Sequence, residues 1–145
     1  MDRPSFDDIY IEMARLLALR STCARMKVGA VIASHDYRKV LSVGYNGNAS
    51  GLPNRCDLVG DAAIGNCGCL HAEENAAIAC DVPRQTRKIV YCTHLPCPMC
   101  AKRLINLGGV ERVVFIEDYR RQESKEILAM ASIEVRKHPA DLGAG

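Results

Sequence analysis

The feature that most constrains this chain is a pair of short motifs that together carry three metal-ligand side chains. The first is His71-Ala72-Glu73, and the second is Pro96-Cys97-Pro98-Met99-Cys100. One imidazole and two thiolates are the protein ligands that a catalytic Zn²⁺ takes when its fourth tetrahedral position stays open for water. We therefore predict a catalytic zinc held by His71, Cys97 and Cys100, and a fold that brings the two segments together.

Glu73 lies two residues after the predicted histidine ligand. This spacing brings its carboxyl close to the metal but places it badly for a fourth ligand, so we predict that it moves protons between the zinc water and the substrate. A bare CxxC pair is common in redox and structural zinc sites. The combination of H-x-E with a later P-C-x-x-C is far more specific, and it points to catalysis.

Composition limits the kind of protein this chain can be. With 145 residues, 48% of them hydrophobic, it is expected to form a single domain over 1–138, followed by a disordered tail over 139–145. The net charge is only +2 and the basic residues are scattered, which argues against a nucleic-acid partner and suits a small phosphorylated ligand.

The N-terminal residues do not resemble a signal peptide, and we find no apolar run long enough to span a membrane. We therefore expect a cytoplasmic protein with no membrane partner. Its eight cysteines are then expected to be reduced thiols, several of them zinc ligands, instead of a disulfide framework.

Hydrophobic periodicity and turn residues predict alternating strands and helices. Helices are expected near 6–20, 71–80, 97–107 and 122–130, and strands near 27–33, 39–45, 88–93, 111–116 and 133–136. The first two strands are predicted to form an antiparallel hairpin, and the Gly-, Asn- and Pro-rich segment 46–70 a long irregular loop. This alternation implies an α/β fold, a three-layer α/β/α sandwich with helices on both faces of the sheet.

The predicted ligands all lie at helix starts. Cys97 begins one helix and Cys100 follows one turn later, while His71 begins another. The positive end of a helix dipole stabilises thiolates and other anions, so two such ends can converge on one metal.

Further segments carry a family resemblance. They are 21–32 (STCARMKVGAVI), 44–47 (GYNG) and 96–102 (PCPMCAK). From residue 20 to about 119 the chain resembles the deoxycytidylate (dCMP) deaminases of the zinc-dependent cytidine deaminase superfamily. The resemblance implies hydrolytic deamination of dCMP to dUMP, a mixed five-stranded sheet of order 2-1-3-4-5, and a homohexamer. It also implies dCTP and dTTP as effectors, although the residues carry no separate signal for such control.

The resemblance also assigns residues to substrate. Asn46 matches a loop contact to the nucleotide, Tyr119 an aromatic contact, and Ala72 a further substrate contact. Each of the first two has a structural alternative, a turn residue and a half-buried strand-end aromatic. We predict Arg25 as a phosphate partner because a guanidinium matches phosphate geometry, the alternative being a solvated arginine before a strand.

The remaining cysteines suggest a second metal. Cys23, Cys56, Cys67 and Cys69 lie before or within the long loop. The resemblance implies a structural zinc with ligands near the positions of Cys23, Cys56 and Cys69. Some of these ligands are His in the family, so Cys67 and Cys69 depart from the pattern, but four thiolates are a standard closed zinc set. The alternative is scattered reduced thiols. Cys80 and Cys92 are expected to be small core residues.

Two other functions compete with a dCMP deaminase. The same chemistry could act on free cytidine, guanine, an RNA adenosine or a modified cytosine nucleotide, although the GYNG segment disfavours these. A non-catalytic zinc-stabilised binding or assembly module is the alternative from another class. Glu73 discriminates against it, because a structural zinc site has no use for an unliganded acid beside its metal.

Overall fold

Five strands form one mixed sheet in the order β2-β1-β3-β4-β5, as expected. The structure is a computed structural model and describes residues 2–57 and 67–139. The strands are β1 (Gly29–Ser34), β2 (Val40–Tyr45), β3 (Lys88–His94), β4 (Val110–Glu117) and β5 (Glu134–Lys137). The helices are α1 (Phe6–Ala18), α2 (Ala72–Ala79), α3 (Pro98–Leu107) and α4 (Glu123–Met130). β1 pairs antiparallel with β2 and β3, while β3, β4 and β5 run parallel.

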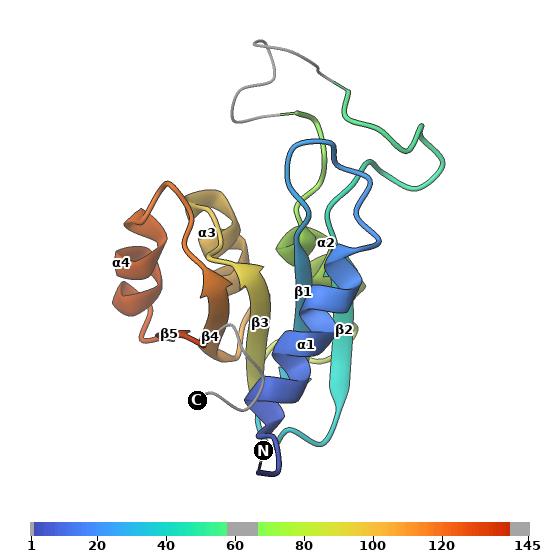
Figure 1. The fold of residues 1–145 in the computed structure, drawn as a ribbon. Helices are drawn as coiled ribbons and strands as arrows, with labels where there is room; N and C mark the ends of the chain where they lie inside the picture. Colours follow the sequence, from blue (N-terminus) through green and yellow to red (C-terminus); the bar gives the residue numbers. More distant parts are fainter. Residues whose placement is uncertain (1, 58–66, 140–145) are drawn as a thin grey trace.

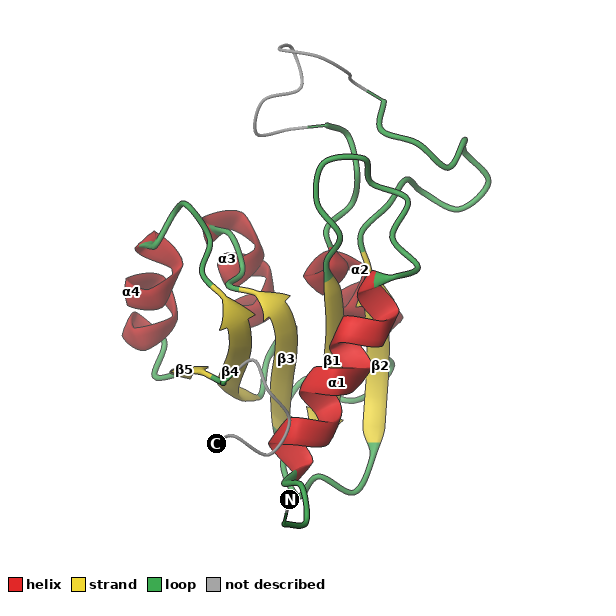
Figure 2. Ribbon diagram, viewed as in Figure 1, coloured by secondary structure: helices red, strands yellow, loops and turns green. Residues whose placement is uncertain are grey.

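Helices cover both faces of this sheet (Figures 1 and 2). α1 packs on one face, against side chains such as Val31 and Tyr91. The small and apolar residues of α2, α3 and α4 pack on the other, against Ile32, Val90 and Val113. Alternate residues of β1 and β3 therefore serve the two cores, as the period of a strand buried on both faces requires. The predicted three-layer α/β/α sandwich is confirmed.

Several element boundaries differ from the predicted ones by one or two residues, for identifiable reasons. β1 begins at Gly29 because the amide of Val28 donates to the Asn46 side chain instead of to a strand. β5 begins at Glu134 because the amide of Ile133 still bonds to Leu128 at the end of α4. A capping box begins α1, with Ser5 and Asp8 exchanging hydrogen bonds of 2.9 and 3.0 Å.

The long loop has little regular structure where it is described. Residues 48–57 and 67–69 contain no helix or strand, and a single bridge joins Gly47 to Leu70. Within the described ranges we find no helix with the length and apolarity needed to cross a membrane. Residues 140–145 of the predicted tail 139–145 lie outside the described residues. The single domain predicted over 1–138 stays a prediction.

A close backbone approach sets the position of α2 against β2. A Cβ built on Gly44 would lie 2.4 Å from the Ala72 carbonyl oxygen and 2.6 Å from the Ala76 nitrogen. The Ser42 hydroxyl donates to the Ala76 carbonyl at 2.6 Å, and the Asn75 side chain donates to the Tyr45 carbonyl at 2.8 Å. Only glycine permits this spacing, and two hydrogen bonds hold the helix in place.

We expect Gly44→Ala to lower the free energy of unfolding by about 1–3 kcal/mol, because the added methyl group meets helix backbone and not a movable side chain. Urea unfolding measures the change. Val43→Ala is the matched control, since Val43 is exposed on the same strand, and it should cost less. An equal or smaller loss in Gly44→Ala would contradict the close-packing argument.

Candidate metal centre and cavity

His71, Cys97 and Cys100 converge on one point. The His71 Nδ1 lies 3.6 Å from the Cys97 Sγ and 3.2 Å from the Cys100 Sγ. Tetrahedral zinc with ordinary Zn–N and Zn–S bonds needs an N-to-S separation of about 3.6 Å. The three donor atoms therefore fit a zinc ion with only small adjustment, and their role as its ligands stays a prediction.

The local backbone explains why these side chains point the same way. His71 is the N-cap of α2 and Cys97 the N-cap of α3, each with extended dihedral angles. The Cys97 sulfur accepts the Cys100 amide at 3.4 Å, and Pro98 occupies the first turn, where its missing N–H costs nothing. Two helix N-termini thus meet at the donors, and their dipoles favour the negative charge of thiolates.

The charges at the site are consistent with a metal centre. The hydrogen bond from the Cys100 thiol, aided by His71, lowers the pKa of Cys97 to about 4. The same interaction and burial raise the pKa of Cys100. Burial raises the pKa of Glu73, whose side chain is almost fully enclosed, although the nearby His71 opposes this. Burial therefore favours the protonated form of the Glu73 carboxyl, which suits a group that transfers protons.

These groups open onto a cavity of about 300 Å³. Its wall includes His71, Glu73 and Cys97, and also the four residues predicted to contact substrate, which are Asn46, Ala72, Arg25 and Tyr119. The structure thus brings the metal ligands, the acid and these four residues to one site. Their individual roles stay predictions.

Asn46 has a further task that its sequence position did not indicate. Its Oδ1 accepts the Val28 amide at 2.8 Å and its Nδ2 donates to the Met26 carbonyl at 2.6 Å. Its side chain is buried and braces the segment that leads into β1. Arg25 is exposed and has no hydrogen bond or ion pair with another described residue, so its guanidinium is available to a ligand.

Sequence reasoning missed part of the cavity wall. Asp118 and Arg120 flank Tyr119 there, and Arg120 stacks over the Tyr119 ring. Both residues follow the end of β4, which pairs with β3, and this position in the sequence could have indicated that they lie near the site. His94 also lines the cavity, and its Nδ1 lies 2.9 Å from the Thr93 hydroxyl. Asp118 pairs with Lys137 at 2.8 Å, which lowers its pKa.

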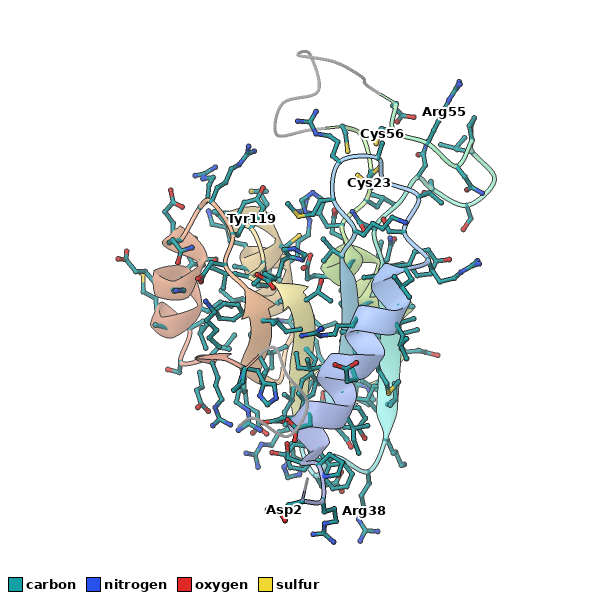
Figure 3. All side chains as sticks on the ribbon, in the orientation of Figure 1. Asp2, Cys23, Arg38, Arg55, Cys56 and Tyr119 are labelled. Atoms are coloured by element: carbon teal, nitrogen blue, oxygen red, sulfur yellow. The ribbon has the colours of Figure 1, made fainter. Side chains whose placement is uncertain are left out.

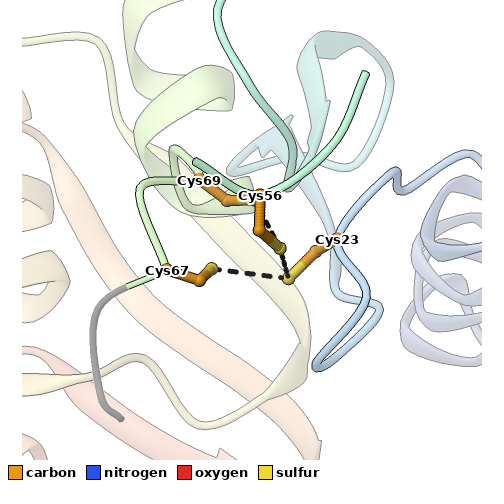
Figure 4. A group of neighbouring side chains, drawn as sticks. All are labelled: Cys23, Cys56, Cys67 and Cys69. Atoms are coloured by element: carbon orange, nitrogen blue, oxygen red, sulfur yellow. Dashed lines mark hydrogen bonds between the residues drawn. The ribbon is translucent and has the colours of Figure 1, made fainter. Parts of the chain in front are cut away.

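Cys23 and the three cysteines of the long loop also gather into one cluster, called the loop cluster below (Figure 4). Cys23 Sγ lies 3.7 Å from the sulfurs of Cys56 and of Cys67, and Cys69 Sγ lies 3.6 Å from that of Cys56. A tetrahedral Zn–thiolate set has sulfur-to-sulfur edges of about 3.8 Å, whereas a disulfide has about 2.0 Å. The donors therefore fit a closed zinc site, which stays a prediction.

The two clusters are neighbours. Cys23, Cys67 and Cys69 line the same cavity as His71 and Cys97. Figure 3 shows Cys23, Cys56 and Tyr119 near one end of the molecule, opposite the end that carries Asp2. Three of the four cysteines of the loop cluster therefore lie in the cavity wall, close to the predicted zinc ligands.

Comparison with known families decides the family. The model of the cytidine and deoxycytidylate deaminase zinc-binding region matches residues 4–117. The chain belongs to this deaminase family. The resemblance stated from the sequence is thereby confirmed, and a family defined by zinc binding agrees with the Cys and His clusters.

Individual relatives of this chain support the family assignment. It is 35% identical to deoxycytidylate deaminase of Saccharomyces cerevisiae over 93% of its length, but spans only 45% of that protein. It is 36% identical to deoxycytidylate deaminase of Mycobacterium phage D29, covering 79% of this chain and 97% of the phage protein. The dCMP deaminase of cyanophage S-TIM5, solved with dCMP and dUMP, matches with TM-score 0.82 and 32% identity over 95% of this chain and 100% of that one.

We expect the purified protein to contain close to two zinc ions per chain by elemental analysis, because both donor sets match zinc geometry. Cys69→Ser should lose one ion and melt at a lower temperature, since a structural zinc contributes folding free energy directly. Cys80→Ser is the control, because Cys80 belongs to neither cluster. One zinc per chain, unchanged in Cys69→Ser, would show that the loop cluster is not a metal site.

Proposed function

We propose that this protein deaminates dCMP by hydrolysis, giving dUMP and ammonia. The observation that carries the proposal is that His71, Cys97 and Cys100 converge on one point, and that the buried Glu73 lines the same cavity as His71 and Cys97. Family membership and the phage relatives support it, and the solved cyanophage relative was crystallised with dCMP and dUMP. The chain spans less than half of its yeast relative. The activity is therefore proposed from the site that this chain itself contains.

The three ligands suit the chemistry. When bound in a three-ligand site of this kind, zinc lowers the pKa of a water molecule to about 7 and so supplies a nucleophile at neutral pH. The chain's part is to hold His71, Cys97 and Cys100 in place from two helix N-termini. It also encloses the substrate, since a buried site excludes bulk water and strengthens each electrostatic contact.

Glu73 is proposed to carry the protons. Deamination at C4 adds the oxygen of one water and releases the exocyclic amine as ammonia, so protons must pass from the water to the base and its leaving nitrogen. Among the described residues, two carboxyls line the cavity, those of Glu73 and Asp118. Asp118 stays ionised because of Lys137, whereas burial raises the pKa of Glu73 toward the range useful for proton transfer. A non-catalytic zinc module would not require this buried acid.

We expect Glu73→Gln to keep the fold and the zinc but to lower kcat by at least about 10²–10⁴-fold, the usual worth of general acid–base catalysis. Glutamine is nearly isosteric and cannot shuttle protons. Ammonia release from dCMP, zinc content and melting temperature should be measured together. Asp118→Asn is the matched control and should retain most activity. A near-native rate in zinc-loaded Glu73→Gln would refute the proposed role.

The phosphate is proposed to be recognised by placed groups, with Arg25 the leading one. A net charge of +2 cannot select among nucleotides by its overall field, so discrimination needs donors in the cavity. Arg25 lines the cavity and its guanidinium is free for a ligand. Such charge-assisted contacts distinguish a monophosphate from a free nucleoside, a base or an RNA substrate.

Deoxycytidine should therefore be a much poorer substrate than dCMP, and Arg25→Ala should lower kcat/KM for dCMP by about ten- to a hundredfold while leaving deoxycytidine unchanged. The control is Lys27→Ala, which removes the same charge from an exposed neighbour that does not line the cavity. If nucleoside and monophosphate gave equal kcat/KM, the enzyme would belong to the free-nucleoside branch instead.

Other family traits are proposed on membership alone. They are a homohexamer, dCTP and dTTP as effectors, and a cytoplasmic location. All eight cysteines are free thiols, which fits a reducing compartment. Light scattering and assays with added dCTP or dTTP test the assembly and the regulation.

A further inference from the structure

A histidine N-cap that serves as a metal ligand leaves its helix without an ordinary cap. Ser, Thr, Asp or Asn at this position would accept amide hydrogen bonds from the first turn and so fix the helix start. The His71 imidazole is directed to Cys97 and Cys100 instead, 3.6 and 3.2 Å away. Something else must therefore fix the backbone of His71.

Glu74 supplies that contact. It lies three residues after the N-cap, and its Oε1 accepts the His71 amide at 3.0 Å. This is the returning half of a capping box, the half in which the third helical residue binds the N-cap backbone. Glu74 thus fixes the orientation of the peptide from which the ligand imidazole projects.

The other oxygen of the same carboxylate reaches the second ligand helix. Glu74 Oε2 lies 3.1 Å from the Nε of Arg103 on α3. Arg103 lies one turn after Cys100 on α3, and Glu74 lies one turn after His71 on α2. The ion pair therefore joins the two helices one turn beyond the contact between His71 and Cys100. The pair joins the two helices that hold the metal donors.

We propose that Glu74 and Arg103 are positioning residues for the catalytic zinc, setting the register between His71 and the two cysteines. The inference rests on the proposed zinc-dependent function. Glu74 acts through the His71 backbone, and Arg103 acts through Glu74. The Glu74 side chain is 17% exposed and that of Arg103 45%, so the capping bond should matter more than the ion pair.

The proposal orders four variants by their affinity for zinc at this cluster, measured by competition with a chromogenic chelator. Glu74→Leu loses both contacts and should weaken binding about five- to tenfold, the typical worth of a helix cap. Glu74→Gln keeps the acceptor for the His71 amide and should lose about two- to threefold, as should Arg103→Met. Arg87→Met, which removes an exposed ion pair with Glu111, is the control and should change nothing.

Cobalt spectroscopy distinguishes positioning from general stabilisation. The absorption bands of the Co²⁺-substituted protein report ligand geometry, and those lost in Cys97→Ser identify this cluster. The bands should shift in Glu74→Leu and stay in Arg87→Met. In the Glu74→Leu background, Arg103→Met should have no additional effect, because its partner is already gone.

Unchanged zinc affinity and unchanged cobalt bands in Glu74→Leu would overturn the inference, even if its melting temperature fell. Should that variant fail to fold, Arg103→Met decides the matter, and binding equal to that of Arg87→Met overturns it. Neither readout depends on turnover of dCMP. A wild-type protein that binds zinc but does not deaminate dCMP would therefore refute the proposed function and leave this inference standing.

Discussion

The convergence of two helix N-termini is the constraint on which the rest of the structure depends, because it brings three donor side chains close enough together to hold one metal ion. The donor atoms of His71, Cys97 and Cys100 lie within 4.8 Å of one another. Separate helices supply the imidazole and the thiolates, so any shift between α2 and α3 separates the donors. The thiolate form of the two cysteines also places negative charge in a buried site. The positive ends of the two helix dipoles stabilise that charge.

The sheet holds these helices at the required spacing. α2 lies flat on β2 because Gly44 has no side chain at the point where the helix backbone passes. α3 follows β3 after a short turn, so Cys97 lies at the carboxyl end of a strand buried on both faces. Ligand sites of parallel sheets commonly occupy this edge, since loops there are free to vary while the strands stay fixed.

The long loop belongs to the site as much as to the surface. Its cysteines gather with Cys23 and line the cavity together with His71 and Cys97. The described part of the loop is also held by Asn48, whose side chain donates to Asp57 at 2.8 Å, and by the Asp57 amide, which donates to the Cys67 carbonyl at 2.9 Å. A metal in the loop cluster would shape one wall of the substrate cavity.

The sequence by itself determined the architecture and predicted the chemistry. Ligands, acid and strand pattern depend on local spacing and side-chain type, so His71, Glu73 and the CxxC pair were identifiable, and the family resemblance supplied the strand order. Only tertiary structure decided that the Asn46 amide braces the β1 entry, that both cysteine sets share a cavity, and that Glu74 pairs with Arg103. These contacts join residues distant in the chain, and they arise from the packing of helices on a sheet, which no local pattern encodes.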